Sequence, residues 1–154
     1  LPRFSPWRPL RRGSAIGRLV GGNLTTIGML LGTPWAPRFQ SGFFPGSRSL
    51  LLWEEWNEEP CDIHQRIVHL RTAGIFDRIS GMIVGKFVRC ENRSYRTSLT
   101  ARQTVAEAVA GYRFPVLTDV DFGHIPAMLT LPIGARAYLR AHTGTIDILD
   151  RAVS

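Results

Sequence analysis

The sequence has 154 residues, of which 44% are hydrophobic and 20% charged, and its formal net charge is +7. This size and composition fit one globular domain with its own core and exclude a disordered chain. No apolar run approaches the roughly 20 residues that span a bilayer, so we expect no membrane partner.

The positive charge comes almost entirely from arginine, because Lys86 is the only lysine. The arginines are scattered, apart from Arg8, Arg11 and Arg12, and no basic stripe alternates with aromatic residues. We therefore expect no nucleic acid as a partner, and an electropositive cleft for an acidic substrate is the more useful interpretation of the charge.

The cysteines and histidines predict neither a metal nor a cofactor. Cys61 and Cys90 have no zinc-type or CxxC spacing, which is typical of free thiols in a reducing compartment such as the cytoplasm. His64 and His69 are five residues apart on a predicted helix, which places them on different faces.

The first predicted element is a segment without periodicity. Residues 1–15 are rich in Pro, Arg and Trp and are expected to form a linker or a docking segment, ahead of a domain over residues 16–154. A short strand over 16–20 leads into Gly21-Gly22-Asn23, and Asn23 is a good N-cap for a helix over 24–31. This turn is either a tight strand-to-helix connection or a set of backbone N–H groups aimed at an anion.

The middle of the chain alternates between predicted strands and helices. An irregular connection over 33–48 precedes an apolar strand over 49–54, and a helix follows over about 60–73. Its apolar stripe consists of Ile63, Ile67 and Leu70, and Gly74 ends it.

The later elements complete an α/β pattern. Residues 81–87 are predicted as a buried strand, Thr100 as the cap of a helix that runs to about Gly111, and residues 114–120 as a third strand. Two alternating strands, 135–141 and 145–150, predict a closing hairpin. The fold class expected is therefore α/β with a mixed sheet.

Two ionisable side chains follow predicted strands. Glu54 ends the strand over 49–54, and His124 comes shortly after the strand over 114–120. A carboxylate that accepts from a His ring N–H fixes the tautomer, so that the other ring nitrogen can act as a general base. The alternative is that Glu54 and Glu55 cap the next helix or face solvent, and that His124 is structural.

The nucleophile of such a triad is missing from the pattern. No Gly-x-Ser-x-Gly elbow occurs, and serines such as Ser14, Ser41, Ser47 and Ser80 have no strand-turn-helix context. If the chain belongs to a triad enzyme, we expect the nucleophilic serine to lie outside these residues, as in a fragment of a longer protein.

The sequence also resembles the LD-carboxypeptidase family of serine peptidases, through short motifs that occur in the family's order. They are Gly17 to Leu24, Gly32-Thr33-Pro34, Leu51 to Glu55, Leu70, Gly74 to Asp77, Gly81 to Phe87, Pro115-Val116, Gly123-His124 and Leu129 to Gly134. The resemblance covers about residues 16–150 and only the C-terminal domain of the family. The Met-Leu-Thr-Leu-Pro ending looks most like the microcin C self-immunity branch.

The resemblance implies a swivelling β/β/α domain that supplies Glu54 and His124 to a Ser-His-Glu triad. It further implies an N-terminal flavodoxin-like domain with the serine, a homodimer, and cleavage of an amide next to a substrate carboxylate. The substrates of the family are murein tetrapeptides in peptidoglycan recycling, or acidic aminoacyl-nucleotides. Gly22, Asn23 and Lys86 match positions near the cleft and are candidates for substrate binding.

The sequence departs from the family pattern at two places, and the change at Glu55 is mild. Glu55 is commonly Asp in relatives, and Ile125 to Met128 differ from the murein enzymes, which weakens the murein substrate. The alternative function is a non-catalytic binding module, or a truncated paralogue, that binds an acidic peptide or nucleotide without hydrolysing it.

Overall fold

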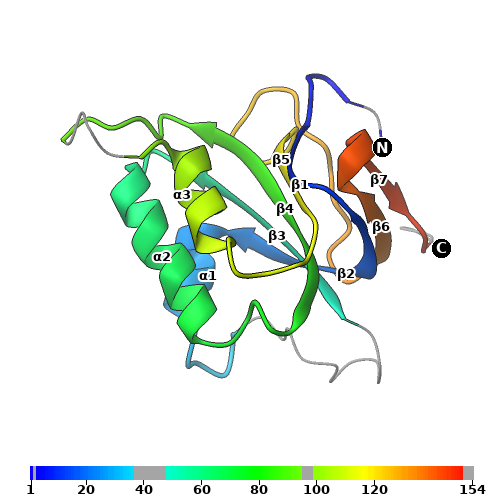
Figure 1. The fold of residues 1–154 in the computed structure, drawn as a ribbon, viewed down its shortest axis with the longest axis horizontal. Helices are drawn as coiled ribbons and strands as arrows, with labels where there is room; N and C mark the ends of the chain where they lie inside the picture. The colour runs from blue at the N-terminus through cyan, green and yellow to red at the C-terminus, as the bar shows by residue number, and fades with distance from the viewer. Residues whose placement is uncertain (2, 37–47, 95–98, 151–154) are drawn as a thin grey trace.

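The computed structural model describes residues 1, 3–36, 48–94 and 99–150. Its elements are β1 (Arg8–Arg11), β2 (Ser14–Asn23), α1 (Leu24–Leu30), β3 (Ser49–Trp56), α2 (Pro60–Thr72), β4 (Ile79–Val88), α3 (Ala101–Ala108), β5 (Val116–Val120), β6 (Arg136–Arg140), a 3₁₀ turn (Ala141–Thr143) and β7 (Thr145–Ile148). Within these residues, seven strands form one sheet in the order β1-β5-β4-β3-β2-β6-β7 (Figure 1).

The sheet is mixed, which confirms the predicted fold class. Strands β2, β3, β4 and β5 run parallel to their neighbours in this group, whereas β1, β6 and β7 pair antiparallel. The carboxyl ends of the four parallel strands therefore meet at one edge, where open α/β sheets place their ligand sites.

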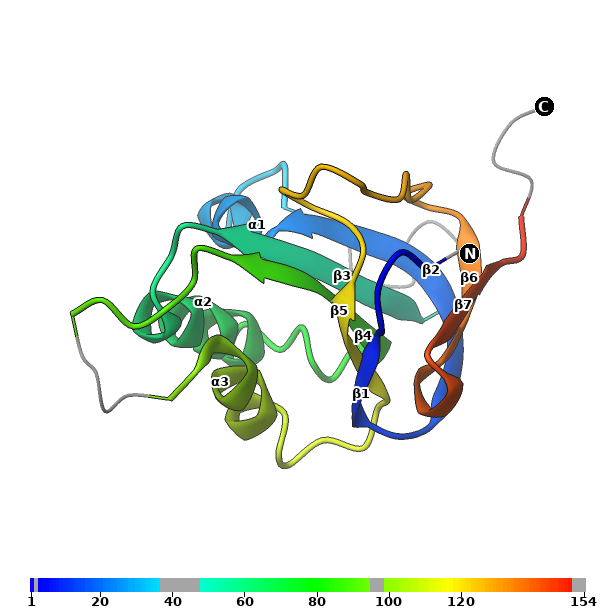
Figure 2. The ribbon, with the colours of Figure 1, turned by 90° about the horizontal axis from the view of Figure 1, so that it is seen from above.

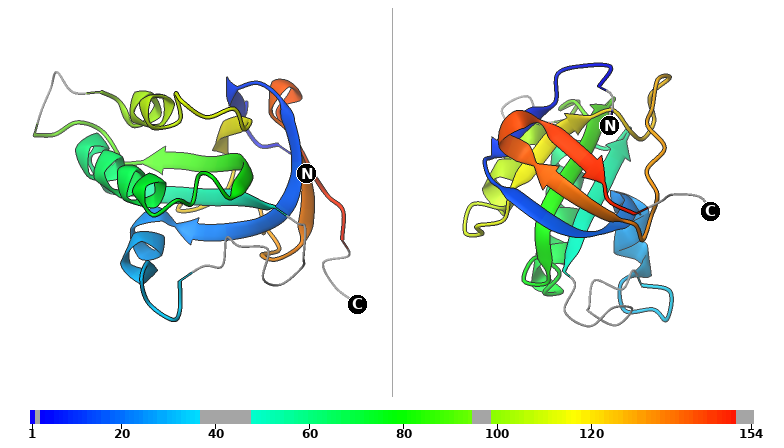
Figure 3. Two further views of the ribbon diagram at one scale, coloured as in Figure 1. Left: turned by 60° about the horizontal axis from the view of Figure 1, so that its bottom comes forward. Right: turned by 90° about the vertical axis from the view of Figure 1, so that its right-hand side faces the viewer.

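The two faces of β3 enter different cores, because successive side chains on a strand point to opposite faces. Leu51 and Trp53 pack with the three helices, whereas Leu50 and Leu52 pack with β5, β6 and β7. Figure 2 shows α2 and α3 on one side of β3 and β4, and the gold segment after β5 on the other. The sheet is strongly curled, so β6 and β7 cover this second face themselves (Figure 3).

The predicted helices are confirmed together with their caps. The Asn23 side chain accepts from the Thr26 N–H at the start of α1, and Pro60 occupies the first turn of α2. Thr100 and Gln103 form a capping box at α3, which ends at Ala108, three residues before Gly111, and is followed by turns over residues 109–111. The stripe of Ile63, Ile67 and Leu70 is buried.

The N-terminal segment differs from the prediction of an irregular linker or docking segment. Arg8–Arg11 form β1, an edge strand that pairs antiparallel with β5, and Trp7 is 4% exposed in the second core. Residues 3–11 therefore pack against the same domain. The signal was weak because the pairing joins segments more than 100 residues apart, and Pro9 interrupts the strand pattern.

The closing hairpin is confirmed, with β6 and β7 antiparallel across a 3₁₀ turn that ends at Gly144. Most of the connection predicted over 33–48, including Ser41 and Ser47, lies outside the described residues. Among the helices that the structure describes, none is long and apolar enough to cross a membrane.

Candidate active site

Glu54 and His124 meet at the carboxyl edge of the parallel strands. The His124 Nδ1 atom lies 2.8 Å from the Glu54 Oε2 atom. The Glu54 side chain is 7% exposed and the His124 side chain 52% exposed. The carboxylate is therefore a buried anchor, and because Nδ1 is occupied, the accessible part of the ring carries Nε2.

Two glycines allow this contact, because β4 lies between β3, which carries Glu54, and β5, which is followed by the loop that carries His124. The loop after β5 passes β4 at Gly85, where a Cβ atom would lie 2.7 Å from Glu54 Cβ and 2.9 Å from the Phe122 carbonyl oxygen. At Gly123, with φ +99°, a Cβ atom would lie 2.6 Å from Glu54 Cγ. The glycine before His124 therefore lets the loop close onto the carboxylate.

Asn23 joins Glu54 to its neighbour Glu55. The Asn23 amide nitrogen lies 3.2 Å from Glu54 Oε1 and 2.9 Å from Glu55 Oε1. Asn23 is the register partner of Glu54 across β2 and β3, so its side chain reaches both consecutive acids. Its oxygen caps α1 by accepting from the N–H and the hydroxyl of Thr26, so the Asn23 side chain is fixed by four hydrogen bonds.

Glu55 is buried on the helix side of β3 with 2% exposure, so the interpretation of these acids as a solvated strand end is wrong. It accepts from the Thr25 N–H at 3.0 Å and from the Thr25 hydroxyl at 2.7 Å through Oε2. Its Oε1 accepts from the Trp56 N–H at 3.1 Å as well as from Asn23. Glu55 thus ties the start of α1 to the end of β3.

Replacing Glu55 by glutamine is expected to lower the free energy of unfolding by about 2 kcal/mol, because the new NH₂ group faces donors and leaves them unpaired in a buried site. Urea denaturation measures the change. The matched control is Glu58→Gln, which removes a partly exposed ion pair with Arg66 and should cost under about 1 kcal/mol. Equal losses for the two variants would contradict this role of Glu55.

The Trp56 ring lies beside the ring of His124. The two rings stack, with centroids 5.7 Å apart and an interplanar angle of 22°. The indole therefore covers one face of the imidazole, and Trp56 itself is 42% exposed.

Asp121 is a second buried carboxylate, three residues before His124 and 1% exposed. Burial alone would raise the pKa of Asp121. Hydrogen bonds from Ser5 and Trp7, with the Lys86 ammonium at 2.9 Å and the Phe4 N–H, lower this pKa well below that of an ordinary aspartate. Asp121 is therefore a fixed negative charge at the base of the loop that carries His124.

The Cys90 thiol lies near Glu55, but its surroundings do not favour the thiolate that a nucleophile needs. Its Sγ atom lies 3.6 Å from the Glu55 carbonyl oxygen. Burial raises the pKa of Cys90, so the group is a neutral thiol at neutral pH.

The three predicted substrate-binding residues have different surroundings. Asn23 lies at the Glu54–His124 pair, whereas the Lys86 ammonium is paired with Asp121. Gly22 has open space where a Cβ atom would stand. The close approach in this turn occurs instead at Gly21, where a Cβ atom would overlap the Leu52 carbonyl oxygen at 1.7 Å.

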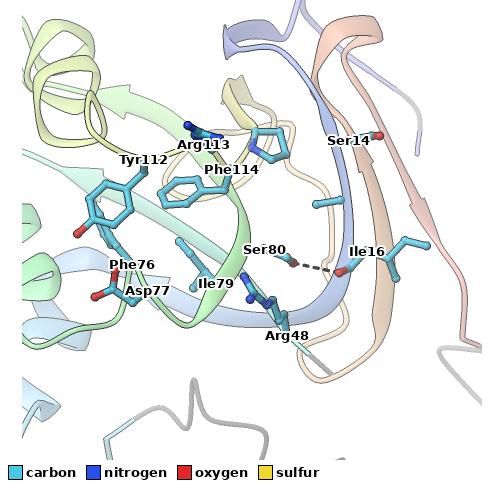
Figure 4. A pocket seen from close by; sticks show the side chains of 12 residues that line it. Ser14, Ile16, Arg48, Phe76, Asp77, Ile79, Ser80, Tyr112, Arg113 and Phe114 are labelled. Carbon is cyan, nitrogen blue, oxygen red and sulfur yellow. Dashed lines mark hydrogen bonds between the residues drawn. The ribbon is translucent and has the colours of Figure 1, made fainter. Parts of the chain in front are cut away.

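A hollow of about 490 Å³ lies at the opposite, amino edge of the strands, and its lining includes Ser14, Arg48 and Ser80 (Figure 4). The Ser80 hydroxyl donates to the carbonyl oxygens of Ile16 and Ser49. Ser80 lies five positions before Gly85 on β4, a span of about 16 Å, and Gly85 is beside Glu54. Ser14, at the far end of β2, is more distant still, so neither serine can reach His124.

Sequence reasoning named the Glu54–His124 pair but missed the residues that hold it. Glu55 and Trp56 were adjacent acidic and aromatic residues at a strand end, and Asp121 immediately followed the strand over 114–120. These signals were present, but the partners of each residue lie far away in the sequence.

Comparison with known proteins assigns the family. The model of the LD-carboxypeptidase C-terminal domain matches residues 16–139. A Synechocystis protein assigned by name to the carboxypeptidases is 32% identical over 139 residues, which are 90% of this chain and 44% of that protein. The microcin C7 self-immunity protein MccF of Escherichia coli is 28% identical over 144 residues, which are 92% of this chain and 39% of that protein.

Solved structures agree with this assignment. MccF in complex with glutamyl sulfamoyl guanosine matches with a TM-score of 0.82 and 25% identity, over 96% of this chain and 42% of that chain. The muramoyltetrapeptide carboxypeptidase from Oxalobacter formigenes matches with a TM-score of 0.75 and 26% identity, over 93% of this chain and 50% of that chain. The chain thus spans half or less of the length of these relatives. It belongs to the LD-carboxypeptidase C-terminal domain family, in the branch that contains MccF.

Proposed function

We propose that this chain supplies the glutamate and histidine of a Ser-His-Glu triad in a serine carboxypeptidase or amidase. The observation that supports it is the contact of 2.8 Å between the buried Glu54 carboxylate and Nδ1 of the accessible His124 ring. This arrangement fixes the proton on Nδ1 and leaves Nε2 as the base.

The proposed mechanism assigns one role to each side chain. The His124 Nε2 atom takes the hydroxyl proton of the serine as the serine oxygen bonds to the amide carbonyl carbon. The imidazolium is stabilised by Glu54 and then gives its proton to the departing amide nitrogen, which breaks the C–N bond. Water repeats the sequence on the acyl-enzyme and releases the acid.

The proposed substrate has an amide bond next to a carboxylate. MccF structures contain glutamyl sulfamoyl guanosine and aspartyl sulfamoyl adenosine, and another structural relative is a muramoyltetrapeptide carboxypeptidase. An excess of arginine in this chain suits either anionic substrate.

Further parts of the proposal concern Asn23, Lys86, Gly22 and the partners. An active-site mutant of MccF has one serine, one asparagine and one lysine replaced by alanine. Asn23 beside Glu54 and Lys86, the only lysine of this chain, are our candidates for comparable polar contacts, with Gly22 lining the turn. The serine is proposed to come from an N-terminal flavodoxin-like domain, in a cytoplasmic homodimer.

The test uses a full-length protein that contains this chain. It is incubated with aspartyl sulfamoyl adenosine and, separately, with a murein tetrapeptide, and the released amino acid is quantified. We expect release of aspartate or of the terminal D-alanine. Binding of either compound by calorimetry without any release would contradict the proposal and support a non-catalytic binding module.

A further inference from the structure

Asp121 gathers donors from two distant parts of the chain. Its Oδ2 atom accepts from the Phe4 N–H at 2.8 Å, the Ser5 N–H at 3.1 Å and the Trp7 indole N–H at 2.8 Å. Its Oδ1 atom accepts from the Ser5 hydroxyl at 2.7 Å and pairs with the Lys86 ammonium at 2.9 Å. A carboxylate buried to this degree, with this many charge-assisted contacts, is held in one position.

The main chain after Asp121 is held as well. The Leu129 N–H donates to the Asp121 carbonyl oxygen at 2.7 Å, the Phe122 N–H to the Val120 carbonyl oxygen at 2.8 Å, and the Ile125 N–H to the Gly123 carbonyl oxygen at 2.9 Å. The loop over residues 121–129 is therefore closed on itself and anchored at its first residue.

His124 needs such an anchor, because more than half of its side chain is exposed and packing alone cannot hold it. Its ring has two fixed contacts, the Glu54 carboxylate and the Trp56 indole, and both lie on the end of β3. The distance between His124 and Glu54 depends on where the backbone of residues 121–124 crosses β4. Asp121 fixes that backbone to Lys86 on β4 and to the N-terminal segment.

We propose that Asp121 is a positioning residue for His124, and that residues 4–7 form a strap that holds the histidine loop in register with Glu54. The inference rests on the proposed function for the role of His124 in catalysis. It extends that function to residues 4–7, which act on the Glu54–His124 pair through their hydrogen bonds to Asp121. Trp7, at one end of the strap, packs in the second core together with Val120 and Phe122.

The test compares four full-length proteins: wild type, Asp121→Asn, the double variant Ser5→Ala/Trp7→Phe, and the control Asp150→Asn. The double variant removes two donors to Asp121 and keeps an aromatic ring in the core, so it tests the strap if Asp121→Asn fails to fold. Asp150 also binds arginines through both oxygens, but on β6 and β2, away from the site.

Three readouts separate positioning from general stability. Hydrogen exchange at the amides of Phe122, Ile125 and Leu129 should become at least about tenfold faster in the double variant and in Asp121→Asn, because charge-assisted hydrogen bonds are lost. Exchange of the Leu149 amide, which donates to the Arg136 carbonyl oxygen, should stay unchanged in the double variant. In samples labelled with ¹⁵N-histidine, the deshielded Nδ1 proton between His124 and Glu54 should broaden or disappear.

For the double variant we expect a fall in kcat of at least about tenfold with KM within about twofold of wild type, because Asp121 still pairs with Lys86, a candidate substrate contact, while the base moves. Wild-type exchange rates and an unchanged Nδ1 proton in the double variant would overturn the inference. If the wild-type protein hydrolyses none of the substrates, the proposed function fails, and the exchange and proton readouts still decide whether Asp121 positions His124.

Discussion

Replacing His124 by alanine in the full-length protein is expected to lower kcat by at least about 10⁴-fold, because the serine loses the base that accepts its proton. Glu54→Gln should lower kcat on the order of 10⁴-fold, because a glutamine NH₂ group faces Nδ1 and favours the wrong tautomer. Both effects should appear in kcat, with KM little changed, in the assay of amino acid release.

The control for His124→Ala is His142→Ala, which removes an exposed histidine in the turn after β6 and should leave kcat unchanged. For Glu54→Gln the control is Glu58→Gln, whose carboxylate pairs with Arg66. Turnover by His124→Ala or by Glu54→Gln at the wild-type rate would remove that residue from the triad.

The second large effect is expected at Gly123. A Cβ atom there would lie 2.6 Å from Cγ and 2.7 Å from Oε2 of Glu54, at a backbone φ of +99°. Gly123→Ala must therefore displace either the carboxylate or the loop, and we expect a loss of about 3 kcal/mol in the free energy of unfolding. The displaced carboxylate should also lower kcat by about 10²-fold or more. Urea denaturation and the release assay measure the two effects.

Gly134→Ala separates crowding from backbone strain. Gly134 has a φ of +88°, but no atom lies within 4 Å of the position of a Cβ atom. It should therefore show only the cost of the strained backbone, about 1 kcal/mol, with normal turnover. If Gly123→Ala and Gly134→Ala lost the same free energy of unfolding and both kept normal turnover, the tight contact between Gly123 and Glu54 would not be needed for activity.

The local elements were predictable because their signals are local. Asn23 and Thr100 were identified as caps from residue type and position, and the apolar spacing of Ile63, Ile67 and Leu70 identified the buried face of α2. The α/β class followed from the alternation of strands and helices. The pairing of Glu54 with His124 was one of two open interpretations of strand ends, and the resemblance to a family favoured it.

The remaining features depend on contacts between distant residues. The pairing of β1 with β5 and the binding of Asp121 to Ser5 and Trp7 join segments more than 100 residues apart, which no local pattern reveals. Likewise, consecutive acids at a strand end suggested solvent exposure. Because side chains alternate along β3, Glu54 points toward His124 and Glu55 points toward α1. Each carboxylate accepts hydrogen bonds there.

The central claim, that Glu54 and His124 serve a serine from outside these 154 residues, is tested most directly by covalent labelling. The full-length protein is treated with a fluorophosphonate, which reacts with activated serines, and the modified peptide is identified by mass spectrometry. We predict that a serine outside this chain is labelled in the wild type, and that labelling is lost in His124→Ala. Labelling of a serine within this chain, such as Ser5, or equal labelling of His124→Ala, would contradict the claim.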